Sequence, residues 1–238
     1  MKRLILMGVV TLAFAGCGAA PEETESATSE IRCERQDPRV FPRDSHPYGA
    51  SYGEWSARQW RWLFSLPATG HPGFDETGAD AGKGQSGPVW FLLSVFNATG
   101  SATRTITVPE GTALFFPIAD NECSDVEAPP FYGADNAARR TCAQAFHYTG
   151  IAAELDGTAL RGLEDHRVTS PPFSFTVPAD NLLGVPAGTE VRSVSDGYFV
   201  MLKPLARGWH DLHFTGTIVE FGATINLTYR IRVVPRHR

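Results

Sequence analysis

Apolar and polar side chains alternate along residues 223–234, and this is the clearest pattern in the chain. The apolar members of the pattern are Ile225, Leu227, Tyr229, Ile231 and Val233. Because successive residues of a strand point to opposite faces, these five side chains share one face. The pattern predicts a strand with one buried and one solvated face, as in antiparallel sandwiches.

Two earlier segments are apolar at nearly every position. Pro88 to Phe96 has the sequence PVWFLLSVF, and Thr112 to Ile118 has the sequence TALFFPI. Strands that are buried on both faces have such sequences. Between them lies Ala102 to Val108, which is followed by a turn at Pro109–Gly111. We therefore expect a sheet that is covered on both sides.

Beyond Gly150 the chain is rich in short strand candidates that are separated by turns. Two Asp-Gly dipeptides, at Asp156 and Asp196, are favoured in tight hairpin turns. The strand candidates are residues 151–155, 173–177, 190–195, 198–205 and 209–216. This spacing predicts a mainly β fold, an antiparallel β-sandwich of immunoglobulin-like or jelly-roll-like type.

An amphipathic helix is predicted over Tyr52–Ser65. Ser51 and Glu54 have the spacing of a capping box, and Pro67 ends the helical pattern. One face of this helix would carry Trp55, Trp62, Leu63 and Leu66. A second, short helix is predicted over Asp135–His147, with Asp135 or Asn136 as its cap and Gly150 as its stop.

The tryptophans of the first helix allow two interpretations. A tryptophan buries on the order of 200 Å², so the helix forms either a layer of core over the sheet or a platform for a ligand. We favour the core, because the apolar strands need a cover. The platform interpretation makes Trp55, Trp60 and Trp90 candidate ligand-binding residues.

The first 30 residues have the features of an export signal. Lys2 and Arg3 precede an apolar stretch that is too short to span a membrane. We expect a signal peptide over 1–16, with Cys17 as a lipid-modified residue; cleavage after Ala15 at an A-x-A site is the alternative. Residues 17–30 are acidic and polar and are typical of a disordered tether, which leaves 31–238 as one domain. Gly18, and not Asp, follows this cysteine. By resemblance to the sorting signals of Gram-negative lipoproteins, this favours the outer membrane as the destination.

Charge and cysteine content fit an exported binding protein better than a nucleic-acid-binding one. The chain has 21 basic and 26 acidic residues, and 19 and 22 remain after the signal and tether are removed. This near-balance gives no basic surface for nucleic acid. In an oxidising compartment Cys123 and Cys142 are the expected disulfide, worth about 3 kcal/mol in the chain-entropy model. Cys33 would be left over, or would replace one of them.

Several local motifs suggest chemistry, but none has the context that the chemistry needs. Gly82–Gly87 matches G-x-G-x-x-G but runs into a strand instead of a helix, so a glycine turn is expected. The acidic residues after the second apolar strand are weak Ca²⁺ candidates on a predicted loop; they include Asp120, Glu122 and Asp125. His210 and His213 would point to opposite faces of a strand, which argues against a zinc site.

Three strings in the chain resemble a family of uncharacterised exported bacterial proteins. They are GQSGPVWFLLSVF, TRTITVPEGTALFFPI and SDGYFVMLKPLARGWHDLHF, and the likeness extends from about Tyr52 to Val234. The resemblance implies a pair of cysteines where this chain has Ala81 and Ile106. The last string is also similar to the closing strands of immunoglobulin-like sandwiches. The resemblance to this family implies no particular activity.

Two functions of different classes follow from these observations. The first is an envelope-anchored binding or structural module, with an envelope protein or a polysaccharide as its partner. In this function a glycan would be contacted by aromatic residues such as Trp55, Trp60 and Trp90. The second is a secreted hydrolase acting on envelope or extracellular polymer through carboxylates of the loops at 67–88 and 119–135, such as Asp75 and Asp80. We favour the first, because the sequence shows no nucleophile and base together.

Overall fold

The structure, a computed structural model, describes residues 36–236, whose compact unit begins at Asp37. The predicted signal peptide (1–16), the lipid-modified Cys17, the tether (17–30) and Cys33 lie outside the described residues. Among the helices that the structure describes, none has the length and hydropathy that a membrane span requires.

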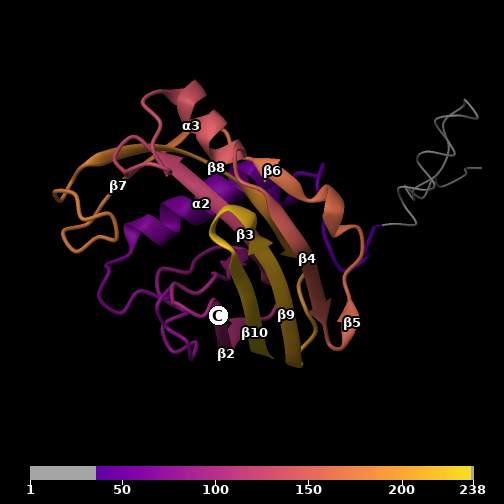
Figure 1. The fold of residues 1–238 in the computed structure, drawn as a ribbon. Coiled ribbons are helices and arrows are strands. Elements are labelled where there is room, and N and C mark those ends of the chain that lie inside the picture. The colour runs from indigo at the N-terminus through magenta and orange to yellow at the C-terminus, as the bar shows by residue number, and fades with distance from the viewer. Residues whose placement is uncertain (1–35, 237–238) are drawn as a thin grey trace, which may run out of the picture. The chain divides into compact units, whose positions relative to one another are not determined.

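The protein is mainly β, as predicted, and its strands form two sheets (Figure 1). The first sheet has the order β1 (Val89–Phe91), β3 (Ala113–Ser124), β8 (Glu190–Leu202) and β6 (Arg167–Thr169), with β7 (Phe173–Thr176) also paired to β8. The second sheet has the order β2 (Ser101–Pro109), β10 (Ala223–Val234), β9 (Gly208–Ile218), β4 (Tyr148–Leu155) and β5 (Thr158–Ala159).

Most strand pairs are antiparallel, but each sheet contains one parallel pair at an edge. In the first sheet β1 runs parallel to β3, and in the second β2 runs parallel to β10. Parallel neighbours require a long connection, and alternation within a single strand does not show which direction its partner will take.

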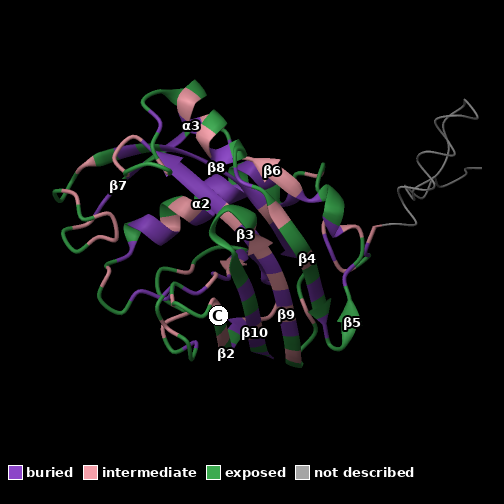
Figure 2. Ribbon diagram, in the orientation of Figure 1, coloured by how far each residue is buried: buried purple, intermediate pink, exposed green. Residues whose placement is uncertain are grey.

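The two sheets face each other across the main core. Leu114 and Phe116 of β3 belong to the same buried cluster as Phe214 of β9 and Leu227 of β10. The rings of Phe116 and Phe214 stack with their centroids 4.9 Å apart. Figure 2 shows the expected alternation of buried and exposed residues along β10, whose bounds match the sequence prediction.

Helix α2 (Tyr52–Ser65) covers the other face of the first sheet, as predicted. Its capping box is complete: Ser51 N donates to Glu54 Oε2 at 2.7 Å, and the Ser51 hydroxyl accepts from Glu54 N at 3.3 Å. Trp55 is only 5% exposed and packs against Phe91 and Phe115 of the sheet. The helix is the reason why β3 is buried on both faces.

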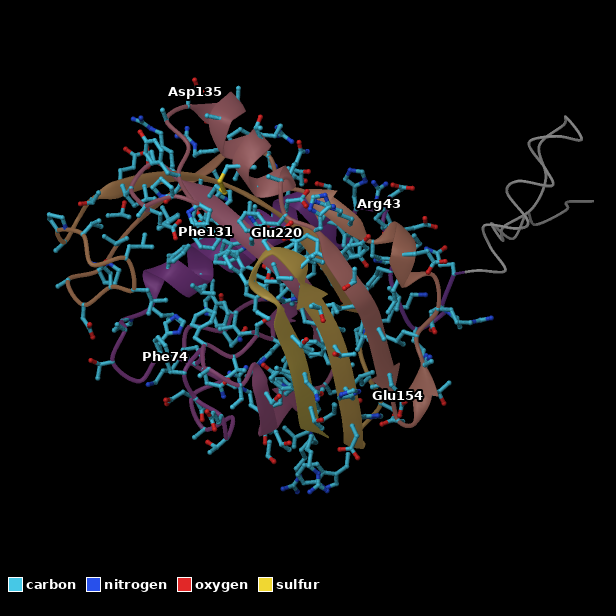
Figure 3. All side chains as sticks on the ribbon, in the orientation of Figure 1. Arg43, Phe74, Phe131, Asp135, Glu154 and Glu220 are labelled. Carbon is cyan, nitrogen blue, oxygen red and sulfur yellow. A yellow bond between two sulfur atoms is a disulfide. The ribbon has the colours of Figure 1, made fainter. Side chains whose placement is uncertain are left out.

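Helix α3 (Asn136–Gln144) is joined to β3 by the predicted disulfide. The Cα atoms of Cys123 and Cys142 are 6.1 Å apart, and the bond is visible beside α3 in Figure 3. Asp135 is the N-cap, accepting from Ala138 N at 2.8 Å. The prediction that Gly150 ends this helix was wrong, because the helix ends at Gln144 and Gly150 lies in β4 at a shift of register. Three short 3-10 turns, η1 (Pro47–Gly49), η2 (Leu163–Asp165) and η3 (Val219–Phe221), complete the elements.

The predicted strand from Pro88 to Phe96 is much shorter in the structure, because β1 ends at Phe91. Beyond it, side chains take over the backbone hydrogen bonds that a neighbouring strand would make. The Gln59 amide donates to the Leu92 carbonyl at 2.7 Å, and the Tyr229 hydroxyl accepts from Leu93 N at 3.1 Å. Because its backbone hydrogen bonds are satisfied in this way, the apolar segment after β1 stays buried although it belongs to no sheet.

Arg104 of β2 points into the core and is 2% exposed. Its guanidinium donates to the carbonyls of Asp75 at 2.7 Å and Pro72 at 3.1 Å, and to the Leu93 carbonyl and the Tyr229 hydroxyl at 2.7 and 2.6 Å. Among the described residues no carboxylate forms a salt bridge with it. A single buried cation thus attaches the long loop at 67–88 to the second sheet and to the segment after β1.

Two further differences concern strand ends near the candidate site. Asp196-Gly197 is not a hairpin turn, since β8 runs through it from Glu190 to Leu202. Gly197 is required there for another reason: a Cβ atom would lie 2.4 Å from that of Asp120 on β3. β3 itself continues to Ser124, so residues 119–124 belong to a strand and not to the predicted loop.

Candidate functional site

A polar groove of about 660 Å³ lies at the edge of the first sheet. We define the polar groove by the segment 43–46, the start of α2 (Ser51–Gly53), Gln144 of α3, β6 with Pro171, and Asp196 of β8. Its volume lies in the range typical of small-molecule sites. Figure 3 labels Arg43 at this edge, on the side of the protein away from Phe74.

The wall formed by β6 and β8 is a connected set of hydrogen bonds. Gln144 donates to the Thr169 hydroxyl at 2.8 Å, and Thr169 donates to Asp196 Oδ2 at 2.7 Å. Arg167 Nε donates to the other oxygen, Asp196 Oδ1, at 2.7 Å. Because Asp196 is buried, these contacts hold the exposed ends of the other three side chains in fixed positions.

Charges in the polar groove are paired within the protein. Arg167 forms its salt bridge with Asp196, and Arg43 with Asp44. The Arg167 guanidinium also lies over the Tyr148 ring, 5.1 Å from its centroid. The groove therefore presents donors and acceptors without a large net charge, which suits a polar, uncharged ligand.

The acidic cluster predicted as a weak calcium site does not assemble. Asp120 and Glu122 lie on β3 under α2, whereas Asp125 accepts from Arg192 N at 2.9 Å and lies 3.8 Å from Arg139. Within residues 36–236, no three His, Cys, Asp or Glu side chains are grouped as metal ligands. Glu122 instead accepts from the Ser193 hydroxyl. Burial and a hydrogen bond with Glu127 raise the pKa of Glu122 well above its usual range.

Asp120 is a second carboxyl group near α2 whose environment favours the protonated form. Burial raises its pKa to about 7, the Trp60 side chain acts in the opposite direction, and the negative charge of Asp196 adds to the increase. The folded protein therefore holds a proton on Asp120 at pH values where the unfolded chain has lost it.

This pKa predicts a pH dependence of stability. As pH rises from about 4, the unfolded-state pKa, to about 7, the folded-state value, the folded state binds more protons than the unfolded state, so stability falls. The contribution of Asp120 has a slope of up to about 1.4 kcal/mol per pH unit. Urea unfolding at pH 5 and pH 8 should show a smaller loss for Asp120→Asn than for the wild type.

The control for this experiment is Asp211→Asn, which removes one carboxylate from an exposed position on β9. If both variants lose the same stability between the two pH values, Asp120 does not carry the effect.

The three candidate tryptophans do not line the polar groove. Trp55 belongs to the core, while Trp60 and Trp90 are half-buried against Phe64 and the main core. The most exposed tryptophan is Trp209, at 59%, on the solvated face of the second sheet beside Arg232. Alternation along β9 could have predicted its exposure, because Trp209 lies on the face opposite to Leu212.

The residues of the other motifs do not line the polar groove and have hydrogen-bond partners elsewhere. Asp75 accepts from Thr77 N and from Asp80 N, both at 2.8 Å, and Asp80 pairs with Lys83 at 2.9 Å. These contacts are those of turn-forming aspartates. Gly82–Gly87 is part of the loop and is followed by β1. His210 contacts Asp156 at 2.7 Å and His213 contacts Asn226 at 2.7 Å, so the two rings have separate partners.

Sequence reasoning missed the residues of the polar groove. Asp196 was predicted to be a turn residue, and β6 is only Arg167–Thr169, too short for a recognisable pattern. The capping box at Ser51 was the one signal near this site, because it located the start of α2 correctly.

Comparison with known proteins adds little to this description. No protein-family model and no curated protein matches the chain. One similar solved chain comes from a structure described as "Structure of PbICP-C in complex with falcipain-2". It shares 13% identity with a TM-score of 0.24, and the match covers 63% of this chain and 100% of the other. A likeness of this size carries no functional argument.

Proposed function

We propose that this protein is a binding module of a bacterial envelope that holds a neutral carbohydrate in the polar groove. The observation that supports the proposal most strongly is the wall formed by Gln144, Thr169, Asp196 and Arg167. Sugar hydroxyls both donate and accept hydrogen bonds, and a rigid set of polar groups recognises them without having to be ordered on binding.

The paired charges support a neutral ligand over an acidic one. An anionic polymer would have to compete with Asp196 for Arg167 and with Asp44 for Arg43. The buried Asp196 would then be left beside the bound anion, which is unfavourable. A polyhydroxylated ligand leaves both ion pairs in place.

The envelope location rests on the N-terminal sequence together with the disulfide. Cys123–Cys142 is a bond typical of proteins outside the cytoplasm. We propose Cys17 as the lipid-modified residue and the outer membrane as its destination, with residues 17–30 as the tether between the anchor and the binding module.

Binding can be measured by titrating the mature chain, with its disulfide intact, with a panel of neutral oligosaccharides and acidic oligosaccharides of similar length. We expect neutral members to shift amide resonances of β6 and of the start of α2. Gln144→Ala and Arg43→Ala should weaken this binding at least tenfold, or about 1.4 kcal/mol.

Arg230→Ala is the matched control, because Arg230 is also an exposed arginine beside a carboxylate, Asp211, but lies on the second sheet. The proposal fails if the groove variants bind like this control, or if no neutral oligosaccharide binds at millimolar concentration.

A further inference from the structure

A second, much smaller cavity lies beneath α2, away from the polar groove. Its volume is about 20 Å³, and it is bounded by α2, the segment that follows β1, and β3. Apolar side chains form most of its wall. The polar members of the wall are Gln59, Trp60, Ser94 and Asp120.

Three polar atoms at this cavity make no hydrogen bond of normal geometry in the described part of the chain, although the Trp60 side chain lies close enough to Asp120 to lower the pKa of that carboxyl group. They are Gln59 Oε1, Trp60 Nε1 and Ser94 Oγ, and all three are buried. Gln59 is 2% exposed, and its Nε2 donates to the Leu92 carbonyl at 2.7 Å. That bond fixes the orientation of the amide, so the unpartnered atom is the oxygen. Buried polar atoms are nearly always hydrogen-bonded in native proteins.

We infer that the cavity binds one ordered water molecule. A site of about 10–15 Å³ is enough to hold one, and the surrounding groups match what water offers. Trp60 N–H needs an acceptor, Gln59 Oε1 needs a donor, and the Ser94 hydroxyl can take either part. Water supplies one acceptor and two donors at the same time.

The same groups disfavour an ion. A metal cation would face the positive end of the Trp60 N–H bond, and an anion would face Gln59 Oε1 and the Asp120 carboxyl group. A bound water satisfies all of them, and it links α2 to the segment after β1 at a place where the protein has no direct hydrogen bond between Trp60 and Ser94. The water therefore forms part of the contact between α2 and the first sheet.

The Trp60 indole N–H provides a direct measurement in the ¹⁵N-labelled full chain. A long-lived water gives this proton cross-peaks to water of opposite sign in NOE and ROE spectra, and Trp60→Phe identifies the resonance by its loss. Trp55 is the internal control, because it is also buried but its Nε1 donates to the Pro47 carbonyl at 2.9 Å. We expect the cross-peaks for Trp60 and not for Trp55.

Two variants show whether the cross-peaks at Trp60 come from a bound water or from the Ser94 hydroxyl proton, which exchanges with bulk water. Ser94→Val fills the cavity and removes the hydroxyl, whereas Gln59→Met removes the acceptor, together with the donor to the Leu92 carbonyl, and keeps the hydroxyl. Both variants should abolish the cross-peaks at Trp60. A high-resolution crystal structure of the wild type should show one water within hydrogen-bonding distance of Gln59 Oε1 and Trp60 Nε1. A dry cavity in that structure, or cross-peaks that persist in Gln59→Met, would overturn the inference.

Discussion

Arg104→Met is expected to lower the free energy of unfolding by about 4 kcal/mol. The methionine would fill a similar space, but the carbonyls of Pro72 and Asp75 would lose the donor that they share, while the Leu93 carbonyl would keep only its hydrogen bond from the Tyr229 hydroxyl. Each buried group left without its partner costs about 1–3 kcal/mol. Such a loss is a large part of the stability of an ordinary domain. Urea unfolding followed by tryptophan fluorescence measures it.

Arg232→Met is the matched control, because Arg232 lies on the solvated face of β10. Its effect should stay within about 0.5 kcal/mol, as for most surface positions. Arg104→Lys separates charge from geometry: an ammonium group keeps the charge but cannot reach all of these carbonyls, so it should recover only part of the loss. Equal stability of Arg104→Met and Arg232→Met would contradict the role given to Arg104.

Trp55→Ala is expected to cost about 3–5 kcal/mol, the range for large core side chains. Trp55 packs against Phe91 and Phe115, and its indole nitrogen donates to the Pro47 carbonyl at 2.9 Å. The variant would leave a cavity at the centre of the contact between α2 and the first sheet. Thermal unfolding should show a fall of several degrees in the midpoint.

Trp209→Ala serves as the comparison, since that side chain is mostly exposed and its loss should change stability little. The two results together test whether α2 is a core layer. An unchanged midpoint in Trp55→Ala would mean that the helix contributes a surface and not a core.

For α2, the sequence pattern predicted the ends of the helix better than the burial of its side chains. The capping box and the stop before Pro67 predicted both ends of α2 correctly, because those signals act over one turn of the chain. The sequence pattern did not show which of its tryptophans is buried most deeply. Trp62 shares the apolar face in the sequence pattern, but it is only partly buried and donates to the Lys83 carbonyl at 3.0 Å. Which part of a helix lies deepest depends on the sheet beneath it.

Polar residues inside strands produced the main errors. Residues 119–124 were predicted to be a loop because acidic residues cluster there, and Asp196 was predicted to be a turn residue because Gly197 follows it. In the structure they lie on β3 and β8, where α2 and the segment near β6 cover them. Their partners, such as Ser193 for Glu122 and Arg167 for Asp196, are distant in sequence. Local sequence propensity cannot predict hydrogen-bond partners that are so distant in sequence.

Arg104 was missed for a similar reason. It occupies an inward position of an alternating strand, where an arginine is rarely found. Only the loop carbonyls, brought there by the fold, make that position favourable. The polar groove belongs to the same class, because its wall is assembled from α3, β6 and β8.

The parallel pairing of β2 with β10 also determines the order in which the protein can fold during synthesis. Among the described strands, β10 is the sole neighbour of β2 in its sheet, and Ser101 pairs with Asn226. A ribosome or an exporter releases β2 long before its partner, so the second sheet cannot close progressively from the N-terminal side. Contacts this distant in sequence are slow to form. Until then both edges of β2 are open to pairing with another chain.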